Sequence, residues 1–373
     1  MSNPSNRLAP VIGACAAVAF LAACSGMQQG AGAPIPPTTQ STAATQTAAA
    51  AGASGEHPLA SVDLLAKTLK SGKVPAQHRL SGKSWINPDL HKKALIYASD
   101  YPLGTVDIYD FAKPNHIVGQ ITGFDEPYGQ CVDKAGDVYV VDFGTANLYE
   151  YAHGATSYFN VATDNYGYPI GCAVDPTSGD IAVTNFQGYN YTTGGVVVFA
   201  GGLRGTQKYY TQSSLYFAWP PGYDRNGNLF VEGSDFYQYY NAFGELPHHG
   251  KSLEILAGVS IGYPASVQGY GKTILAADQS YNGTLTTAIY NVSAFGSTAT
   301  VTHTSVLTDD CFDGGSDIMG TAQPFAYNGR VVAGNGACAD RFGYWNLTYG
   351  GNPFKTIPAG IAPKYAYGES VSP

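Results

Sequence analysis

The chain has 373 residues, of which 46 are glycine and 28 are tyrosine, and only 12% are charged, with a net charge of −8. A long helix or coiled coil needs many charged residues, a nucleic-acid-binding protein needs a basic cluster that this sequence lacks, and a disordered chain would not be 44% hydrophobic. Many glycines and aromatic residues with few charges instead predict short strands joined by tight turns.

Residues 1–23 have the layout of a secretory signal. Arg7 precedes an apolar run, from Val11 to Ala23, that is shorter than a membrane-spanning helix. The run ends in Leu-Ala-Ala-Cys24-Ser25, which resembles the lipobox of bacterial lipoproteins, where the cysteine is lipidated after cleavage. The resemblance implies an exported protein held on a membrane through lipid on Cys24. The alternative is an ordinary secretory signal with an incidental cysteine, which also implies export.

The segment after Cys24 indicates where the protein is located and how far its folded domain can extend from the membrane. In the bacterial lipoproteins that this motif resembles, a serine after the cysteine permits sorting to the outer membrane in the best-studied bacteria. The resemblance at Ser25 therefore implies a cell-envelope protein at the outer membrane or cell surface, with the periplasmic side as the alternative. Residues 24–56 are almost entirely Gly, Ala, Ser, Thr, Gln and Pro and are predicted to be a flexible tether. Residues 57–93 are predicted to be a solvated connector, in which residues 58–70 have the apolar spacing of one short helix.

From about residue 94 the sequence repeats itself, and the repeat predicts the fold. Each unit combines an apolar strand, a tight turn that contains Gly and a second apolar strand, which is the pattern of a β-hairpin. The units begin at Pro127, Pro169, Pro220, Pro264 and Pro324. Further strands are expected at residues 147–152, 195–200 and 285–292.

The two ends of the repeat region complement each other. Residues 94–100 match a second strand that has no first strand before it, and residues 358–362 match a first strand that has no second strand after it. Pairing them completes a sixth unit, and residues 94–373 then provide roughly 47 residues per unit, which suits a four-stranded propeller blade. We therefore predict an all-β fold, a six-bladed β-propeller closed by pairing of its N- and C-terminal strands.

The repeated pattern has a family resemblance. Pro-x-Gly-x-x-Val-Asp followed by Gly-(Asp/Asn)-Val-Tyr-Val-x-Asp resembles the NHL repeat and the wider six-bladed group that includes the SMP-30/gluconolactonase family and TolB-like propellers. The pattern is clear in the units that begin at Pro127 and Pro169 and weaker in the others. The resemblance implies the fold, but no single activity, because such propellers are hydrolases, lyases or binding modules.

One face of the predicted propeller collects polar and aromatic side chains, because the second strand of each unit ends where its first strand begins. The second strands end in Asp100, Asp142, Asn185, Asp235, Asp278 and Asn335, and the neighbouring candidates are Tyr101, Glu126, Phe143, Phe186 and Trp219. As a ligand face, these oxygens suit Ca²⁺ or another divalent cation, and the rings suit a sugar or a peptide. In the structural alternative, the acids accept hydrogen bonds from turn N–H groups and the rings pack between blades.

The enzymatic alternative is a divalent-metal-dependent hydrolase or lyase on the same scaffold. SMP-30-type enzymes carry a Glu in an early Glu-Gly-Pro segment and an Asn in a Pro-Asn-Gly segment, and here Glu126 is present but Ile170 replaces the Asn. The catalytic Asp-Gly of that family is matched only by Asp313-Gly314, in the acid-rich residues 308–317. His248 and His249 lie in one loop and have no counterpart at blade spacing. The family's metal set is not reproduced, and whether the protein is an enzyme stays open.

Cysteine positions support export. Cys131 and Cys172 occupy nearly the same register in consecutive inner strands, and Cys311 and Cys338 lie 27 residues apart in the last region. We predict these two pairs as disulfides, with free thiols as the alternative.

Together these patterns predict a lipid-anchored β-propeller that acts as a binding module at the cell envelope. The expected partner is a small molecule, a sugar or a protein at the propeller face. Nucleic acid is excluded by the lack of a basic cluster, and membrane contact is expected through the lipid anchor alone.

Overall fold

The computed structural model describes residues 82–237, 240–284, 286–308, 323–335, 341–357 and 366–373, all within the compact unit Ala53–Pro373. The described residues form strands and short 3₁₀ turns, so the predicted all-β fold is confirmed. The turns are η1 (Pro88–Leu90), η2 (Tyr101–Leu103), η3 (Tyr189–Tyr191), η4 (Ser213–Leu215) and η5 (Tyr281–Gly283). Within the described ranges, no helix has the length and apolar character needed to cross a membrane.

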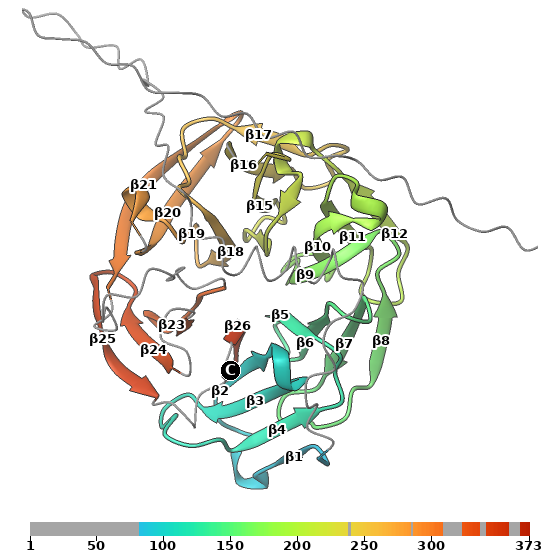
Figure 1. Cartoon of the computed structure of the whole chain (residues 1–373), viewed down its shortest axis with the longest axis vertical. Coiled ribbons are helices and arrows are strands. Elements are labelled where there is room, and N and C mark those ends of the chain that lie inside the picture. Colours follow the sequence, from blue (N-terminus) through green and yellow to red (C-terminus); the bar gives the residue numbers. More distant parts are fainter. Residues whose placement is uncertain (1–81, 238–239, 285, 309–322, 336–340, 358–365) are drawn as a thin grey trace, which may run out of the picture. The chain divides into compact units, whose positions relative to one another are not determined.

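The strands form successive antiparallel sheets that stand around a common centre (Figure 1). The first sheet has the order β1 (Trp85–Ile86), β4 (Gly119–Thr122), β3 (Thr105–Asp110), β2 (Leu95–Asp100) and β26 (Ala366–Ser372). The second sheet consists of β5 (Pro127–Val132), β6 (Val138–Asp142), β7 (Asn147–Tyr151) and β8 (Asn160–Thr163). The third consists of β9 (Gly167–Val174), β10 (Ile181–Gly188), β11 (Gly195–Phe199) and β12 (Gln207–Tyr210).

The remaining strands continue the same up-and-down order. The fourth sheet contains β13 (Phe217–Ala218) and β14 (Gly222–Tyr223), both paired with β15 (Leu229–Ser234), then β16 (Asn241–Leu246) and β17 (Glu254–Leu256). An eight-stranded sheet holds β18 (Pro264–Tyr270), β19 (Thr273–Asp278), β20 (Thr287–Phe295) and β21 (Thr298–Leu307), followed by β22 (Phe325–Tyr327), β23 (Arg330–Asn335), β24 (Arg341–Asn346) and β25 (Gly350–Ile357). A single parallel pair, Leu307 with Gly351, joins its two antiparallel runs.

The first and last parts of this unit share a sheet, because β2 pairs antiparallel with β26. The position predicted for the closing strand, residues 358–362, is wrong: those residues lie outside the described ranges, and the strand that pairs with β2 is Ala366–Ser372. Residues 366–372 read Ala-Tyr-Gly-Glu-Ser-Val-Ser, which aligns with Pro-Tyr-Gly-Gln-Cys-Val-Asp at residues 127–133. Two residues of the predicted connector, in β1, also join this sheet by pairing with β4.

The innermost strands contact one another in the cyclic order β26, β5, β9, β14, β18, β22 and back to β26. Buried apolar clusters fill the space between consecutive sheets. Val106 and Ile108 of β3 pack with Val140 of β6, and the cycle ends where Ile96 of β2 packs with Tyr344 of β24. Burial of these alternating side chains, at roughly 25 cal/mol per Å² of apolar surface, is the main force that holds neighbouring sheets together.

In the second and fourth sheets, the hairpin turns between first and second strands share one chemistry. The carboxylate of Asp133 accepts hydrogen bonds from the N–H groups of Ala135 (2.9 Å) and Asp137 (2.8 Å), and Gly136 adopts φ 90°, a conformation that suits glycine. Asp224 holds its own turn in the same way, by accepting from the N–H groups of residues 226 and 228. These aspartates therefore set the hairpins that the repeat predicts.

The unit predicted to begin at Pro220 departs from the others. In the second sheet Pro127 lies opposite Asp142, whereas in the fourth sheet Ala218 lies opposite Gly233. Residues 219–221 separate β13 from β14, because prolines have no N–H to donate to the ladder. The register of this unit is therefore shifted, and Gly233 occupies the position that Asp142 holds in the second sheet.

Candidate functional site

Two of the acids predicted for the ligand face are buried and bound to the backbone of their own sheet. The carboxylate of Asp142 accepts hydrogen bonds from the N–H groups of Asp125 (3.0 Å) and Glu126 (2.7 Å). Asp278 accepts from the N–H groups of Gly262 and Tyr263, at 2.9 Å each. These bonds fix the loop that leads into each first strand, which is the structural role weighed against ligand binding.

Asn185 and Asp100 have related roles. The side-chain amide of Asn185 donates to the carboxylate of Asp164 (3.0 Å), and burial raises the pKa of Asp164 to about 6. Asp100 caps η2 by accepting from the N–H of Leu103 (3.4 Å). Here too the polar side chain supports the local backbone.

The last strand-end candidates are placed differently. Asp235 lies beyond β15, which ends at Ser234, and its carboxylate accepts from the N–H of Tyr240 (3.3 Å). It was predicted as a strand-end residue, and the register shift of this sheet explains why it instead closes a loop. Asn335 ends β23, but its side chain lies outside the described structure.

No three His, Cys, Asp or Glu side chains gather in a way that could hold a metal ion within the described ranges. Glu126 is buried, and His248 lies 3.8 Å from the carboxylate of Asp175. The acid-rich segment with Asp313 falls outside those ranges, as do Cys24, Cys311 and Cys338. The divalent cation therefore stays a prediction.

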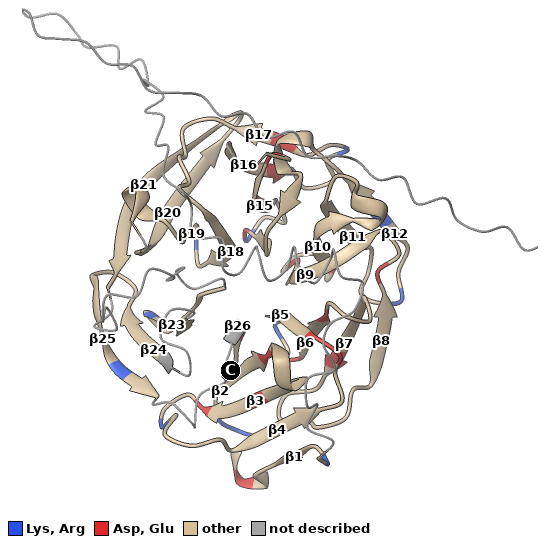
Figure 2. Cartoon of the chain, viewed as in Figure 1, with Lys and Arg blue, Asp and Glu red and all other residues tan. Residues whose placement is uncertain are grey.

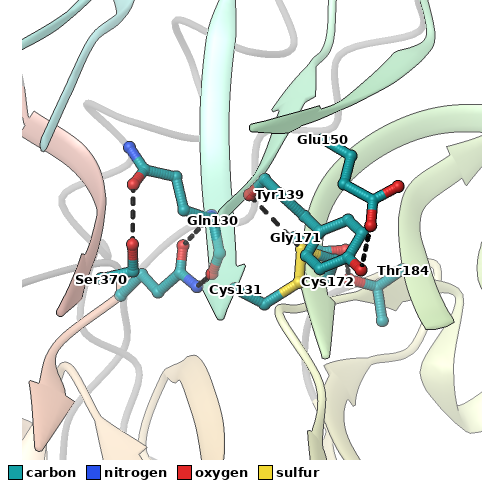
Figure 3. Close-up of a disulfide and its surroundings, with 9 residues drawn as sticks. Gln130, Cys131, Tyr139, Glu150, Gly171, Cys172, Thr184 and Ser370 are labelled. Carbon is teal, nitrogen blue, oxygen red and sulfur yellow. Dashed lines mark hydrogen bonds between the residues drawn. A yellow bond between two sulfur atoms is a disulfide. The ribbon is translucent and has the colours of Figure 1, made fainter. Parts of the chain in front are cut away.

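The predicted disulfide between Cys131 and Cys172 is confirmed, with a Cα–Cα distance of 5.5 Å (Figure 3). It joins β5 to β9, the inner strands of consecutive sheets. Beside it, the amide of Gln130 is hydrogen-bonded to the hydroxyl of Ser370 (2.9 Å), which links β5 to the closing strand β26.

The aromatic residues of the predicted face do come together. Tyr101, Phe143, Phe186 and Trp219 are buried in one cluster with Tyr128 and Ile170. The rings meet edge to face, with centroids 5.9 Å apart for Tyr101 and Tyr128 and 5.8 Å apart for Phe186 and Trp219. This cluster lies where the inner strands begin, and we call that end of the strands the aromatic end.

A second group of rings at the aromatic end is exposed around a half-buried tyrosine. We call it the tyrosine surface; its exposed members are Tyr191, Phe236, Tyr237 and Tyr240, and the half-buried one is Tyr216. The exposed fractions are 53% for Tyr191, 55% for Phe236, 69% for Tyr237 and 74% for Tyr240. They come from the loops that follow β10 and β15 and from the turn before β13. Such a concentration of exposed rings is unusual for surface that stays in water.

The tyrosine surface rests on the buried cluster through ring contacts. Phe236 meets Tyr216 edge to face at 4.9 Å, and Tyr216 meets Phe217 at 4.9 Å. Phe217 then packs against the buried Phe186 at 4.7 Å. Phe236 is therefore supported from below by packed aromatic side chains, and Tyr237 in turn contacts Phe236 edge to face at 5.1 Å, which limits the freedom of both rings before any partner binds.

The loop that carries Tyr191 is strained. Asn190 and Tyr191 have φ values of 58° and 60°, in the left-handed region that a bulky residue rarely adopts. The hydroxyl of Tyr216 donates a hydrogen bond to the carbonyl of Tyr191 and holds this conformation. Strain of this kind is concentrated at functional sites, so it marks the tyrosine surface as more than an incidental exposed patch.

The tyrosine surface lay outside the sequence-based prediction because its loops fall outside the repeat register. The amino-acid composition of these loops does indicate a binding surface. Residues 186–195, 213–217 and 233–241 are rich in Tyr, Gly, Ser and Asn, and Asp235 is their only charged residue. Figure 2 shows that charged residues are scattered thinly over the sheets.

Comparisons with known proteins define the fold more than the function. No protein-family profile matches the chain, and no curated protein matches its sequence. A chain of a nidogen–laminin complex superposes with a TM-score of 0.53 and 15% identity, over 75% of this chain and 98% of that chain. A protein of unknown function from Bacteroides caccae superposes with a TM-score of 0.52 and 11% identity, over 75% and 99%. At these identities the likeness shows a propeller-like β fold alone.

Proposed function

We propose that this protein is an exported, lipid-anchored, six-bladed β-propeller that binds a protein partner at the cell envelope. The cyclic order of the inner strands and the NHL-like repeats support six blades. The lipobox at Cys24 and the tether at residues 24–56 support an anchored module with reach above the membrane. The metal-dependent enzyme of the alternative hypothesis has no supporting ligand cluster within the described ranges.

The tyrosine surface is the observation that carries a binding function. Cores of protein interfaces are enriched in tyrosine and depleted of charged residues, and a few buried aromatic side chains supply most of the affinity. Loops rich in Tyr, Ser, Gly and Asn are also the composition of antibody combining sites, where tyrosine gives a large contact area at low entropic cost. The three loops of the tyrosine surface share this composition, with one charged residue among them.

The openness of the surface favours a protein over a small molecule. Small-ligand sites are concave and bury roughly 70–90% of the ligand, as a general rule. The outer rings here are exposed by 53–74% and form an open surface. One similar structure, the nidogen–laminin complex, is itself a protein–protein assembly, which supports this kind of partner.

The test is site-specific photocrosslinking in cells that make the full-length chain. A photoreactive phenylalanine analogue at Tyr237 is expected to give one dominant protein adduct, which mass spectrometry then identifies. With that partner purified, Tyr237→Ser is expected to raise Kd about tenfold, which corresponds to about 1.4 kcal/mol. The matched control is Tyr349→Ser, because Tyr349 is 83% exposed and belongs to no tyrosine cluster within the described ranges.

The crosslinking experiment has two outcomes that contradict the proposal. One is the same set of adducts from the analogue at position 237 and at position 349. The other is an identified partner whose Kd is unchanged by Tyr237→Ser.

The lipid anchor has a separate test. Metabolic labelling with an alkyne fatty acid is expected to label the wild-type protein and to fail with Cys24→Ser, which also leaves the membrane fraction. Cys15→Ser is the matched control, since that cysteine precedes the cleavage site and is expected to have no effect. Labelling that persists in Cys24→Ser would contradict the proposed lipid anchor on Cys24.

A further inference from the structure

The inner strands enclose a cavity of about 180 Å³ at the end opposite the aromatic end. Its walls are the later halves of β5 and β9, together with β14, β18 and β22. We call this end of the inner strands the cavity end. The tyrosine surface takes no part in the cavity, so a ligand bound there is independent of the proposed protein partner.

Close backbone contacts between neighbouring inner strands lie between the cavity and the aromatic end, and we call these contacts the floor. A side chain on Gly129 would place its Cβ 2.7 Å from the Cα of Gly171, and one on Gly368 would place its Cβ 2.7 Å from the Cα of Gly129. The amide of Gln323 spans the same region, donating to the carbonyl of Gln130 (2.9 Å) and accepting from its N–H (3.3 Å). The inner strands β26, β5 and β9 therefore approach most closely on the side of the cavity that faces the aromatic end, and we call the cavity the cup.

The wall of the cup is fixed in position. The disulfide between Cys131 and Cys172 forms part of it and ties β5 to β9 (Figure 3). On the other side, the amide of Gln268 bridges β18 to β22 by donating to the carbonyl of Ala326 (3.0 Å) and accepting from its N–H (2.7 Å). A preformed wall reduces the entropic cost of binding a small molecule.

The lining is neutral and keeps unused hydrogen-bonding groups. Among the residues that the structure describes, none that lines the cavity is Asp, Glu, Lys, Arg or His. The hydroxyl groups of Ser266 and Tyr223 both belong to the lining and form no hydrogen bond within the described ranges. Burial raises the pKa of Tyr223, which keeps its hydroxyl protonated and able to donate.

The inner strands add backbone groups to this supply. β5, β9, β18 and β22 each pair with a neighbour in their own blade along one edge. On the other edge, the backbone groups of Gln130 and Ala326 are bonded to the amides of Gln323 and Gln268, and the N–H of Val267 is bonded to the carbonyl of Pro220. The remaining N–H and C=O groups of this edge face the centre, where a ligand with several hydroxyl groups can pair with them. Pro221 and Phe325 contribute apolar surface for the face of a ring.

We propose that this cavity binds a neutral monosaccharide. The volume is close to the roughly 150 Å³ of an engineered cavity that admits benzene, so it suits one six-membered ring. A charged ligand would be buried without a partner, which is unfavourable. A ring with one hydroxyl would leave the Ser266, Tyr223 and strand-edge groups largely unpaired, whereas a pyranose carries hydroxyl groups around its circumference.

The test is saturation-transfer NMR on the full-length protein with separate solutions of D-glucose, D-galactose, N-acetyl-D-glucosamine, D-glucuronate and phenol. At least one neutral sugar is expected to receive saturation, and glucuronate is not. Ser266→Ile fills the cup and is expected to abolish the transfer. Ser293→Ile is the matched control, because Ser293 is exposed in β20 and does not line the cavity.

A second variant keeps the test decisive should Ser266→Ile fail to fold. Tyr223→Phe removes a hydroxyl that has no partner within the described ranges, so the fold is expected to persist while the sugar binds about fivefold more weakly. Saturation of phenol alone, of glucuronate as strongly as the neutral sugars, or of no sugar at all would overturn the proposal. Transfer that Ser266→Ile and Tyr223→Phe both leave unchanged would also overturn it.

Discussion

The two ends of the inner strands are built from the same repeats and are used differently. At the aromatic end, carboxylates such as Asp142 bind backbone N–H groups, and rings fill the space between sheets. At the cavity end, the inner strands line a cup beside the disulfide, and its described lining carries no charged side chain. The repeated polar residues therefore serve the fold, whereas the exposed rings arise in loops outside the repeat register and the unpaired hydroxyl groups lie on the inner strands at the cavity end.

The largest effect is expected at the cavity end. Replacing both Cys131 and Cys172 by alanine removes a bond that spans 41 residues, and loop-closure entropy then predicts a loss of about 4 kcal/mol of unfolding free energy. Urea unfolding of the oxidised wild type, the reduced wild type and the double variant measures it. The reduced wild type should resemble the variant, and a loss below about 1 kcal/mol would show that the aromatic end alone holds these sheets together.

A second prediction tests the floor, the close contacts between inner strands that lie between the aromatic end and the cavity end. Gly129→Val places methyl groups against the backbone of β9, where no side chain can move aside, and is expected to cost about 3 kcal/mol. Gly82→Val is the matched control, since a Cβ there meets nothing within 4 Å. Equal unfolding midpoints for the two variants would mean that the inner strands do not meet as closely as described.

The aromatic end can be tested at its strand-end acids. Asp142→Ala leaves the N–H groups of Asp125 and Glu126 without their acceptor and is expected to cost about 2–3 kcal/mol. Asp235→Ala, in a loop, is expected to cost less than about 1 kcal/mol. Thermal or urea unfolding separates the two. A stable Asp142→Ala protein would instead favour a ligand-binding role for that carboxylate.

The smallest effect is expected at Glu232, and it has the opposite sign. Burial, with a further contribution from Asp278, raises the pKa of this carboxyl well above its ordinary value, so the folded state retains a proton that the unfolded state releases. Its contribution to stability is present below the unfolded-state pKa and is lost as the pH rises. Glu232→Gln should therefore match the wild type at about pH 4.5 and exceed it at about pH 8. Urea midpoints at both pH values measure this, and a constant difference would contradict it.

Much of the fold follows from the repeat, and one error is instructive. The spacing of hairpins predicted the strand pairs, and the shared register of Cys131 and Cys172 predicted their disulfide. A proline at the strand start predicts the closing strand at residues 358–362, whereas residues 366–372 keep the Tyr-Gly-x-x-Val core of the unit without the proline. Proline is a weak marker here because the first residue of a strand can be proline but does not have to be.

The candidate sites were less predictable, for a physical reason. The strand-end acids could be read either as ligands or as turn acceptors, and only their hydrogen bonds distinguish the two roles. The tyrosine surface depends on how loops of different sheets, such as those of Tyr191 and Tyr237, approach one another. The cup depends on how far apart the inner strands stand. Neither distance is encoded within one repeat.

The pairing of β2 with β26 has a consequence for how the protein is made. Nearly the whole sequence between residues 95 and 372 must be present before the first sheet gains its innermost strand. Until then β2 exposes an unpaired inner edge, and contacts between segments so distant in sequence form slowly. This order of events suits the proposed export, because a polypeptide that crosses a membrane unfolded cannot complete its tertiary structure before its last strand has followed.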